Sequence, residues 1–136
     1  MKSILIPTLR YHDPAKAITF LSEAFGFEEK AAFKNDEGIV IHAELAIGDG
    51  ILMIGWTGYD SPFGQFLIHP DETKGRNTMT GFIVVEDPDA HYAQAQAAGA
   101  EILLPLVEQS YGGKDYSCRD IEGYVWSFGS YDPRKN

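Results

Sequence analysis

The sequence predicts an α+β fold made of two tandem βαβββ modules, and three observations support this prediction. First, the chain repeats itself at an offset of 74 residues, which aligns residues 11–27 with 85–101 and residues 42–55 with 116–129. Second, an Asp-Pro pair opens a helix-like segment in both copies. Third, each copy closes with two apolar segments joined by a glycine-containing turn, which is typical of a β-hairpin.

The first module is expected over residues 3–56. After an apolar strand, Asp13 suits the N-cap of a helix because its short carboxylate accepts hydrogen bonds from free backbone N–H groups. Pro14 suits the first turn, where its missing N–H removes no hydrogen bond. The helix places apolar residues on one face and should end near Gly26, and a Gly-Asp-Gly turn then joins the last two strands.

The second module is expected over residues 79–131 and follows the same order. Asp87 and Pro88 open an alanine-rich helix that should end near Gly99, and a Glu-Gly-Tyr turn precedes the closing strand. The two modules together form a single domain, which suits a chain of 136 residues.

The segment at residues 57–78 reads as a linker because it is rich in glycine, proline and turn-forming residues. It also carries Phe63, Phe66 and Leu67, which a fully solvated linker would not need. These apolar residues favour a linker that folds over a site, and simple packing is the alternative.

Composition excludes several classes of function. The net charge is −9, and no basic stripe is present to bind nucleic acid. No apolar run reaches the length of about 18 residues that spans a membrane. A single cysteine, Cys118, and a start without a secretory signal favour a cytoplasmic protein.

The phrases "HAELAIGDGILMIG" and "RDIEGYVWSFGSY", with the paired modules, resemble the vicinal oxygen chelate superfamily. This superfamily contains glyoxalase I, extradiol dioxygenases, fosfomycin-modifying enzymes and bleomycin-resistance proteins, and the chain is most similar to the bleomycin-resistance and PhnB-like branch. The resemblance implies the glyoxalase/bleomycin-resistance fold, in which each module forms a cupped mixed sheet and a homodimer completes the cavities.

In metal-dependent members of the superfamily, four ligands come from the first and last strands of both modules. The matching positions here are Ile6, Met53, Gly81 and Ser127, which provide no imidazole or carboxylate. Since a catalytic divalent ion needs three or four nitrogen or oxygen donors, no metal cofactor is expected at these positions.

Strand alternation indicates which residues face the cavity. His42 and Glu44 should look into the concave side, because the residues between and beside them form an apolar face. At the offset of 74, their counterparts are Tyr116 and Cys118. Trp126 and Phe128 should instead turn toward the helices. The complete expected ligand-binding set is Thr8, Arg10, His42, Glu44, Met53, Trp56, Phe63, Phe66, Ile83, Tyr116, Cys118 and Ser127.

Other polar residues receive structural interpretations. His12 and His91 lie near helix starts and are expected to face solvent. Arg119 and Asp120 are expected to form an ion pair at a turn, and Cys118 is expected to be a small buried residue rather than a nucleophile.

The leading hypothesis is a metal-free, dimeric small-molecule binding protein of the bleomycin-resistance type, which sequesters a small aromatic or cationic ligand. No catalytic residue is assigned. The alternative is a glyoxalase-type lyase or dioxygenase with a displaced divalent metal at His42 and Glu44, completed by His69 and Cys118. A third candidate binds an ordinary metabolite and has no present role in antibiotic resistance.

Overall fold

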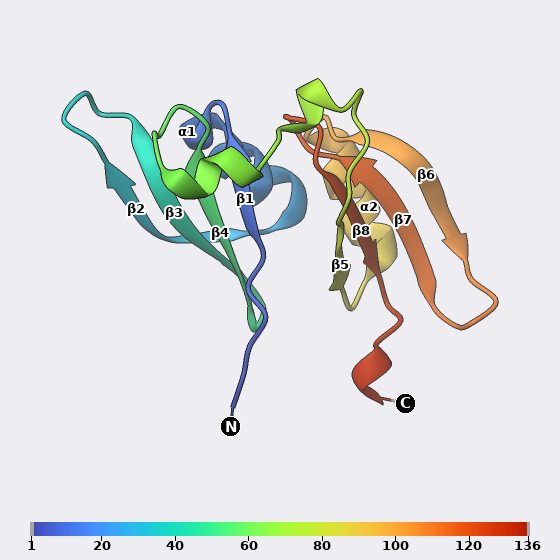
Figure 1. The fold of residues 1–136 in the computed structure, drawn as a ribbon. Coiled ribbons are helices and arrows are strands. Elements are labelled where there is room, and N and C mark those ends of the chain that lie inside the picture. Colours follow the sequence, from blue (N-terminus) through green and yellow to red (C-terminus); the bar gives the residue numbers. More distant parts are fainter. Residues whose placement is uncertain (1, 136) are drawn as a thin grey trace.

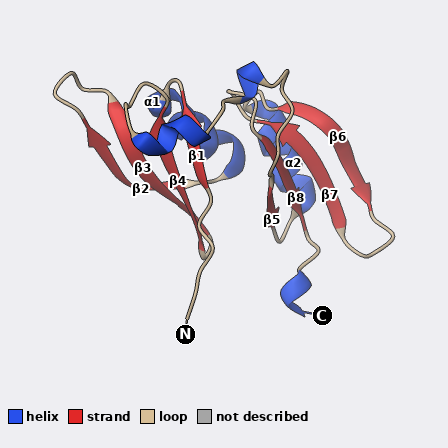
Figure 2. Ribbon diagram, in the orientation of Figure 1, coloured by secondary structure: helices blue, strands red, loops and turns tan. Residues whose placement is uncertain are grey.

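The computed structural model describes residues 2–135 and contains two four-stranded mixed sheets with helices on one face of each (Figures 1 and 2). The strand orders are β1-β4-β3-β2 and β5-β8-β7-β6, so each half is one βαβββ module and the predicted α+β fold is confirmed. The strands are β1 (Thr8–Tyr11), β2 (Glu28–Lys34), β3 (Val40–Ile47), β4 (Gly50–Trp56), β5 (Gly81–Val84), β6 (Glu101–Glu108), β7 (Lys114–Arg119) and β8 (Val125–Gly129).

Both helices begin where the Asp-Pro pairs predict. Helix α1 (Pro14–Phe20) is capped by Asp13, whose side chain accepts from the Lys16 N–H, and it continues into the π-helical turn η1 (Leu21–Phe25). This turn ends at Gly26 with φ of 89°, a left-handed conformation that costs glycine little. Helix α2 (Pro88–Ala97) is capped by Asp87 in the same way.

The linker between the modules contains two short 3-10 helices, η2 (Pro62–Phe66) and η3 (Pro70–Glu72), and a third, η4 (Pro133–Lys135), lies at the C-terminal end. Figure 1 shows η2 in front of the first sheet, on the face opposite helix α1. No helix among residues 2–135 is long and apolar enough to cross a membrane.

The hydrophobic core joins the two modules because α2 packs against η1. His91 of α2 lies at this contact, with Nε2 2.8 Å from the Phe25 carbonyl oxygen and Nδ1 2.6 Å from the Tyr116 hydroxyl. Burial lowers the pKa of His91, so the imidazole is held neutral. The expectation that His91 faces solvent is therefore wrong, because the module contact covers the start of α2.

Register determines which face of each sheet a side chain occupies. In the first sheet, Ala43 pairs with Ile54 and Leu45 with Leu52, and all four are buried under α1. The intervening residues of β3 and β4 point to the opposite, concave face. Each concave face is therefore lined by every second residue of its strands.

Candidate functional site

The concave face of the first sheet carries a cavity. Thr8 pairs with Met53 and Arg10 with Gly55 across parallel strands β1 and β4, while His42 pairs with Gly55 across antiparallel strands β3 and β4. Side chains of paired residues lie on the same face, so β1, β3 and β4 present one surface to the linker.

This surface and the linker enclose an open cavity of about 230 Å³. Most of its walls are aliphatic or aromatic, with a few hydroxyl and imidazole groups, which is the usual composition of a small-molecule site. The lining residues are Thr8, Leu9, Arg10, Ile41, His42, Met53, Ile54, Gly55, Trp56, Tyr59, Ser61, Phe63 and Leu67.

The structure brings together here half of the expected ligand-binding set: Thr8, Arg10, His42, Met53, Trp56 and Phe63. Glu44 adjoins the cavity through His42, whose Nε2 lies 3.1 Å from Glu44 Oε2. Phe66, on the same 3-10 helix as Phe63, is 82% exposed and lies outside the cavity wall.

Arg10 holds the loop that borders the cavity. Its Nη2 donates to the carbonyl oxygens of Trp56, Thr57 and Tyr59 at 3.2, 2.9 and 3.2 Å. A Cβ at Gly64 would lie 2.7 Å from Arg10 Nη1, so a larger residue where the linker crosses the guanidinium would displace the end of the Arg10 side chain. Through these hydrogen bonds, Arg10 fixes the loop that forms part of the cavity wall.

Tyr116 and Cys118 lie on the helix-facing side of the second sheet, so their expected place in the cavity is wrong. Tyr116 is fully buried and contacts Tyr92 of α2 edge-on at 4.9 Å, and Cys118 pairs with buried Trp126. Burial raises the pKa of the Cys118 thiol to about 12, which agrees with the inert, buried residue that was expected.

The reversal has a simple cause in the length of one turn. Core residues Leu45 and Leu52 are separated by six residues, whereas their counterparts Cys118 and Trp126 are separated by seven. The offset is therefore 74 on the last strand of each module but 73 on the strand before it. A slip of one residue moves every side chain of a strand to the other face.

The expected place of Ile83 in the cavity is also wrong. It pairs with Phe128 across parallel strands β5 and β8 and packs against the core, so Phe82 and Val84 are the β5 residues that reach the concave side. Ser127 does lie on this concave face, where its hydroxyl is 2.7 Å from that of Ser117.

The expected displaced metal site at His42 and Glu44 is not assembled with His69 and Cys118. Cys118 is in the core, and His69 lies at the junction between the modules. Among residues 2–135, no third His, Cys, Asp or Glu joins His42 and Glu44 in a cluster with metal-ligand spacing.

Sequence reasoning missed Tyr59 and Ser61 as cavity residues. The available signal was the aromatic content of the linker, which extends beyond Phe63 and Phe66 to Tyr59. The concave positions of Ser117 and Phe82 were also missed because they depend on register.

A second group of polar residues lies at the junction between the modules, where the end of β1 meets the β7–β8 turn. The Asp120 carboxylate accepts from the Tyr11 hydroxyl at 2.6 Å and from Trp126 Nε1 at 3.0 Å. Its other oxygen accepts the backbone N–H groups of Glu122 and Tyr124 at 3.0 and 3.1 Å. Asp120 therefore connects the two modules, and the expected ion pair with Arg119 is wrong because Arg119 pairs with Glu101 instead.

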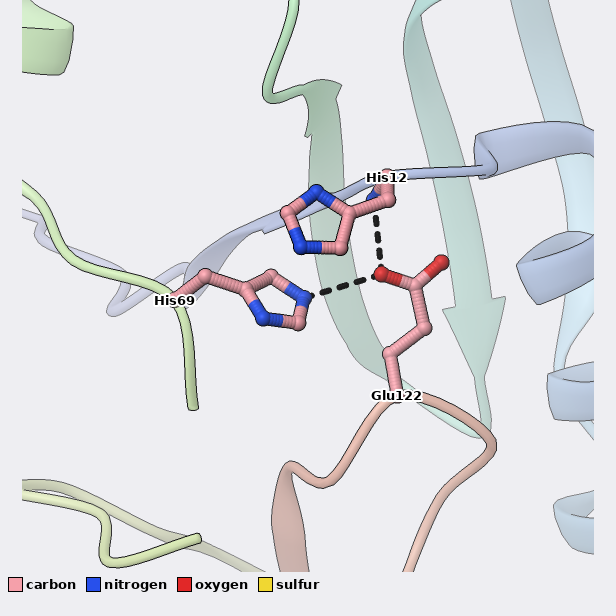
Figure 3. Close-up of side chains that lie close together, drawn as sticks. All are labelled: His12, His69 and Glu122. Carbon is pink, nitrogen blue, oxygen red and sulfur yellow. Dashed lines mark hydrogen bonds and ion pairs between the residues drawn. The ribbon is translucent and has the colours of Figure 1, made fainter. Parts of the chain in front are cut away.

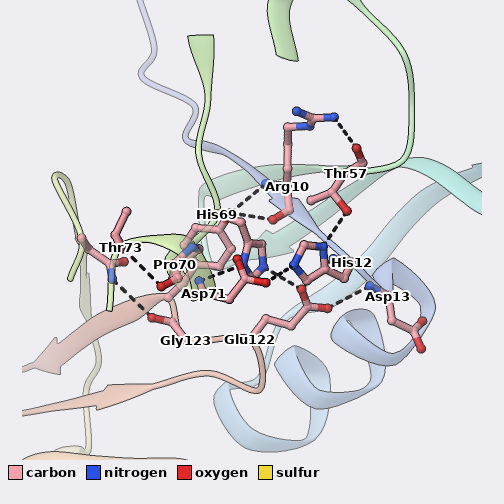
Figure 4. A network of polar contacts seen from close by, with 12 residues as sticks. Arg10, His12, Asp13, Thr57, His69, Pro70, Asp71, Thr73, Glu122 and Gly123 are labelled. Atoms are coloured by element: carbon pink, nitrogen blue, oxygen red, sulfur yellow. Dashed lines mark hydrogen bonds and ion pairs between the residues drawn. The ribbon is translucent and has the colours of Figure 1, made fainter. Parts of the chain in front are cut away.

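His12, His69 and Glu122 meet at the same junction between the modules (Figures 3 and 4). The two imidazole rings stack with centroids 3.8 Å apart, and His69 Nε2 lies 2.9 Å from Glu122 Oε1. Glu122 also accepts the backbone N–H groups of His12 and Asp13 at 2.6 and 2.9 Å. Asp71 Oδ2 lies 2.7 Å from His12 Nε2, and this hydrogen bond lowers the pKa of Asp71.

Paired βαβββ modules with a cavity on a concave sheet define a class of small proteins that use one scaffold for binding and for catalysis. The profile of the Glyoxalase/Bleomycin resistance protein/Dioxygenase superfamily matches residues 3–128, so the chain belongs to this superfamily.

Individual relatives agree with this placement. The uncharacterized protein Mb0911c of Mycobacterium bovis is 30% identical over 125 residues, which cover 92% of this chain and 81% of that protein. TioX from Micromonospora sp. ML1 superposes with a TM-score of 0.72 at 29% identity, over 94% of this chain and 98% of TioX. The fosfomycin resistance protein FosX from Mesorhizobium loti, at 14% identity and a TM-score of 0.68, covers 99% of this chain and 97% of its own and shows the fold alone.

The metal-ligand positions of the superfamily do not fit a divalent ion here. Met53 and Ser127 lie on the concave faces of two different sheets and offer one thioether and one hydroxyl. Gly81 pairs with Trp126, and a side chain at this position would meet the indole ring at 3.0 Å rather than enter the cavity. Ile6 supplies no donor atom, so the four positions lack the donor set that a catalytic ion requires.

Proposed function

We propose that this protein binds and sequesters a small molecule in the cavity on its first sheet, without a catalytic metal in that cavity. The observation that carries the proposal is the apolar cavity itself, whose walls include Met53, Trp56 and Phe63. His42 also lines the cavity, with its Nε2 3.1 Å from Glu44 Oε2. Binding by burial and stacking is what such walls support best.

The chemistry of the walls favours a planar aromatic ligand that carries a positive charge. Phe63 lines the cavity from the linker, where an aromatic ring face would attract a cation, and the Glu44 carboxylate adjoins the cavity through His42. Arg10 is the one Lys or Arg side chain among the described lining residues, and its guanidinium already binds carbonyl oxygens. The net charge of −9 favours the approach of cations over that of anions.

The proposal includes a second copy of the chain that completes the cavity. The cavity measures about 230 Å³. Sites for drug-sized ligands measure about 300–1,000 Å³, so this cavity is smaller than such a ligand needs. The concave face of the second sheet also exposes apolar residues, namely Phe82, Val84, Leu104 and Val107. A second copy would cover such a surface, and native mass spectrometry of the purified chain would show a dimer if it does.

A titration with planar aromatic cations, bleomycin included, tests the binding function. Trp56 lines the cavity and Trp126 is in the core, so ligand binding should quench only part of the tryptophan fluorescence. Phe63→Ala should weaken binding by about tenfold, which corresponds to about 1.4 kcal/mol. Phe66→Ala is the matched control, because Phe66 lies on the same short helix but outside the cavity.

Two outcomes would count against this function. If none of the planar aromatic cations gave heat, a thermal shift or fluorescence quenching, the proposal of a cationic aromatic ligand would be wrong. Equal losses of affinity in Phe63→Ala and Phe66→Ala would move the binding site away from the cavity.

The second candidate is a lyase or dioxygenase with a displaced divalent metal at His42 and Glu44. The close approach of His42 Nε2 to Glu44 Oε2 favours it, but two ligands fall short of the three protein ligands typical of catalytic zinc. Further donors would have to come from a second copy. An ion that copurifies with the protein and is lost on His42→Ala would favour this candidate over sequestration.

A further inference from the structure

The residues at the junction between the modules carry donors that the cavity does not use. His12 follows β1, His69 lies in the linker and Glu122 lies in the β7–β8 turn, so three distant segments meet at one place (Figure 3). One nitrogen of each histidine and one oxygen of Glu122 all lie within 4.8 Å of one another.

We propose that His12, His69 and Glu122 form a binding site for one divalent transition-metal ion of the Zn²⁺ class, separate from the cavity on the first sheet. Two imidazoles and one carboxylate are an established donor set for Zn²⁺, and the same set with open positions also suits Fe²⁺. Ligand atoms around a tetrahedral zinc ion lie about 3.3 Å apart at bond lengths near 2.0–2.1 Å. The donors lie within 4.8 Å of one another, so a contraction of at most about 1.5 Å gives the spacing that one tetrahedral ion requires.

The surroundings give both rings hydrogen-bonding partners, and the stacked arrangement requires one ring to turn before both can bind the same ion. His12 Nδ1 lies 2.7 Å from the Thr57 hydroxyl oxygen, and Nε2, the proposed metal-binding atom, lies 2.7 Å from Asp71 Oδ2, a contact that the ion would replace. His69 Nδ1 lies 3.0 Å from Asp71 Oδ1, so a metal at Nε2 would complete a carboxylate–histidine–metal arrangement. Such outer partners fix the ring tautomer and orientation at metal sites.

The hydrogen bonds of His69 in the structure correspond to the tautomer with the proton on Nε2. The Asp71 N–H lies 3.2 Å from His69 Nδ1, and Nε2–H donates to Glu122. An ion at Nε2 replaces the proton shared with Glu122, and the ring takes the other tautomer, in which Nδ1–H donates to Asp71 Oδ1. The side chains of His69 and Glu122 are 5% and 12% exposed, while that of His12 is 50% exposed and leaves a route for the ion.

An ion at this site would tie β1, the linker and the β7–β8 turn together (Figure 4). The linker also carries Phe63 in the cavity wall, so the ion would stabilise the segment that borders the ligand site. The proposal concerns this structural role and does not depend on the ligand of the cavity.

The experiment uses the full chain after a chelator has removed any bound metal. Zn²⁺ binding is measured by calorimetric titration, and Co²⁺ binding is followed in parallel by visible absorption. One equivalent should bind with micromolar or tighter affinity, raise the thermal midpoint and give the Co²⁺ spectrum of nitrogen and oxygen ligands. His12→Ala and Glu122→Gln should each weaken binding at least tenfold, and the half-exposed His12 is the variant expected to fold normally.

His42→Ala is the matched control, since it removes a histidine that also contacts a carboxylate but lies outside the cluster. Its affinity for Zn²⁺ should equal that of the unchanged protein. The proposal is overturned if the unchanged protein binds no ion at tens of micromolar, if His12→Ala binds as tightly as the unchanged protein, or if His42→Ala loses the site.

Discussion

Replacing Tyr11 with phenylalanine removes one hydroxyl group from the junction between the modules. Tyr11 is fully buried, and its hydroxyl donates to Asp120 Oδ2 at 2.6 Å. Burial raises the pKa of Tyr11 well above its usual value, so the hydroxyl stays protonated. A hydrogen bond to a charged acceptor contributes about 1.5–3 kcal/mol to stability.

Tyr11→Phe should lower the free energy of unfolding by about 2 kcal/mol and the melting temperature by roughly 6–10 °C for a chain of this size. The fold should survive, because Trp126 Nε1 and two backbone N–H groups still donate to Asp120. Urea denaturation followed by tryptophan fluorescence and circular dichroism would measure both quantities.

Tyr59→Phe is the control for this measurement, since Tyr59 is 50% exposed and should lose less than about 0.5 kcal/mol. If Tyr11→Phe were no more destabilised than Tyr59→Phe, the role given to the Tyr11–Asp120 hydrogen bond would be refuted.

Three further predictions concern the loop, a buried histidine and the thiol. Arg10→Met removes the hydrogen bonds to the Trp56–Tyr59 loop, each of which contributes about 1 kcal/mol. Amide hydrogen exchange at Thr57 and Tyr59 should therefore become roughly tenfold faster or more. Unchanged exchange rates would argue against the role of Arg10 in holding this loop. The folded-state pKa of His91 lies below the ordinary 6.5, so its stabilising effect is complete above pH 6.5 and lost as the pH falls toward the folded value. Thermal melts at pH 7.5 and 5.5 should therefore show a loss that is smaller in His91→Gln, and an equal loss in both proteins would argue against His91 as its source. Cys118, with a pKa of about 12, should not react with a thiol reagent at pH 8 until denaturant is added, and rapid reaction of the folded protein would contradict its burial.

The fold was predictable because its boundaries follow from local chemistry. Asp13 and Asp87 cap the helices through neighbouring backbone groups, and Gly26 ends the first helical segment in a left-handed conformation. Such interactions reach only a few residues along the chain, so the sequence pattern contains them.

The site was predictable only in the first module. Alternation within β3 and β4 correctly separated His42 from the buried face, since the turn between these strands is short and regular. The extension to Tyr116 and Cys118 failed because it assumed that both modules have turns of equal length.

The contacts at the junction between the modules could not be predicted from local sequence patterns. Tyr11 and Asp120 are 109 positions apart, and a pairing at this distance depends on how the two modules pack. The proximity of His12 to His69 depends on the course of the linker for the same reason.

The additional residue in the β7–β8 turn also makes the two halves of the protein unequal as building blocks. A chimera in which the shorter hairpin of the first half replaced that of the second would lose Asp120, Glu122 and Tyr124, and with them the contacts to β1. A Cβ at Gly48, in the tight turn of the first half, would meet no heavy atom within 4 Å, so loop insertions there should be far better tolerated. Although the chain repeats itself, only one of its two hairpins is replaceable.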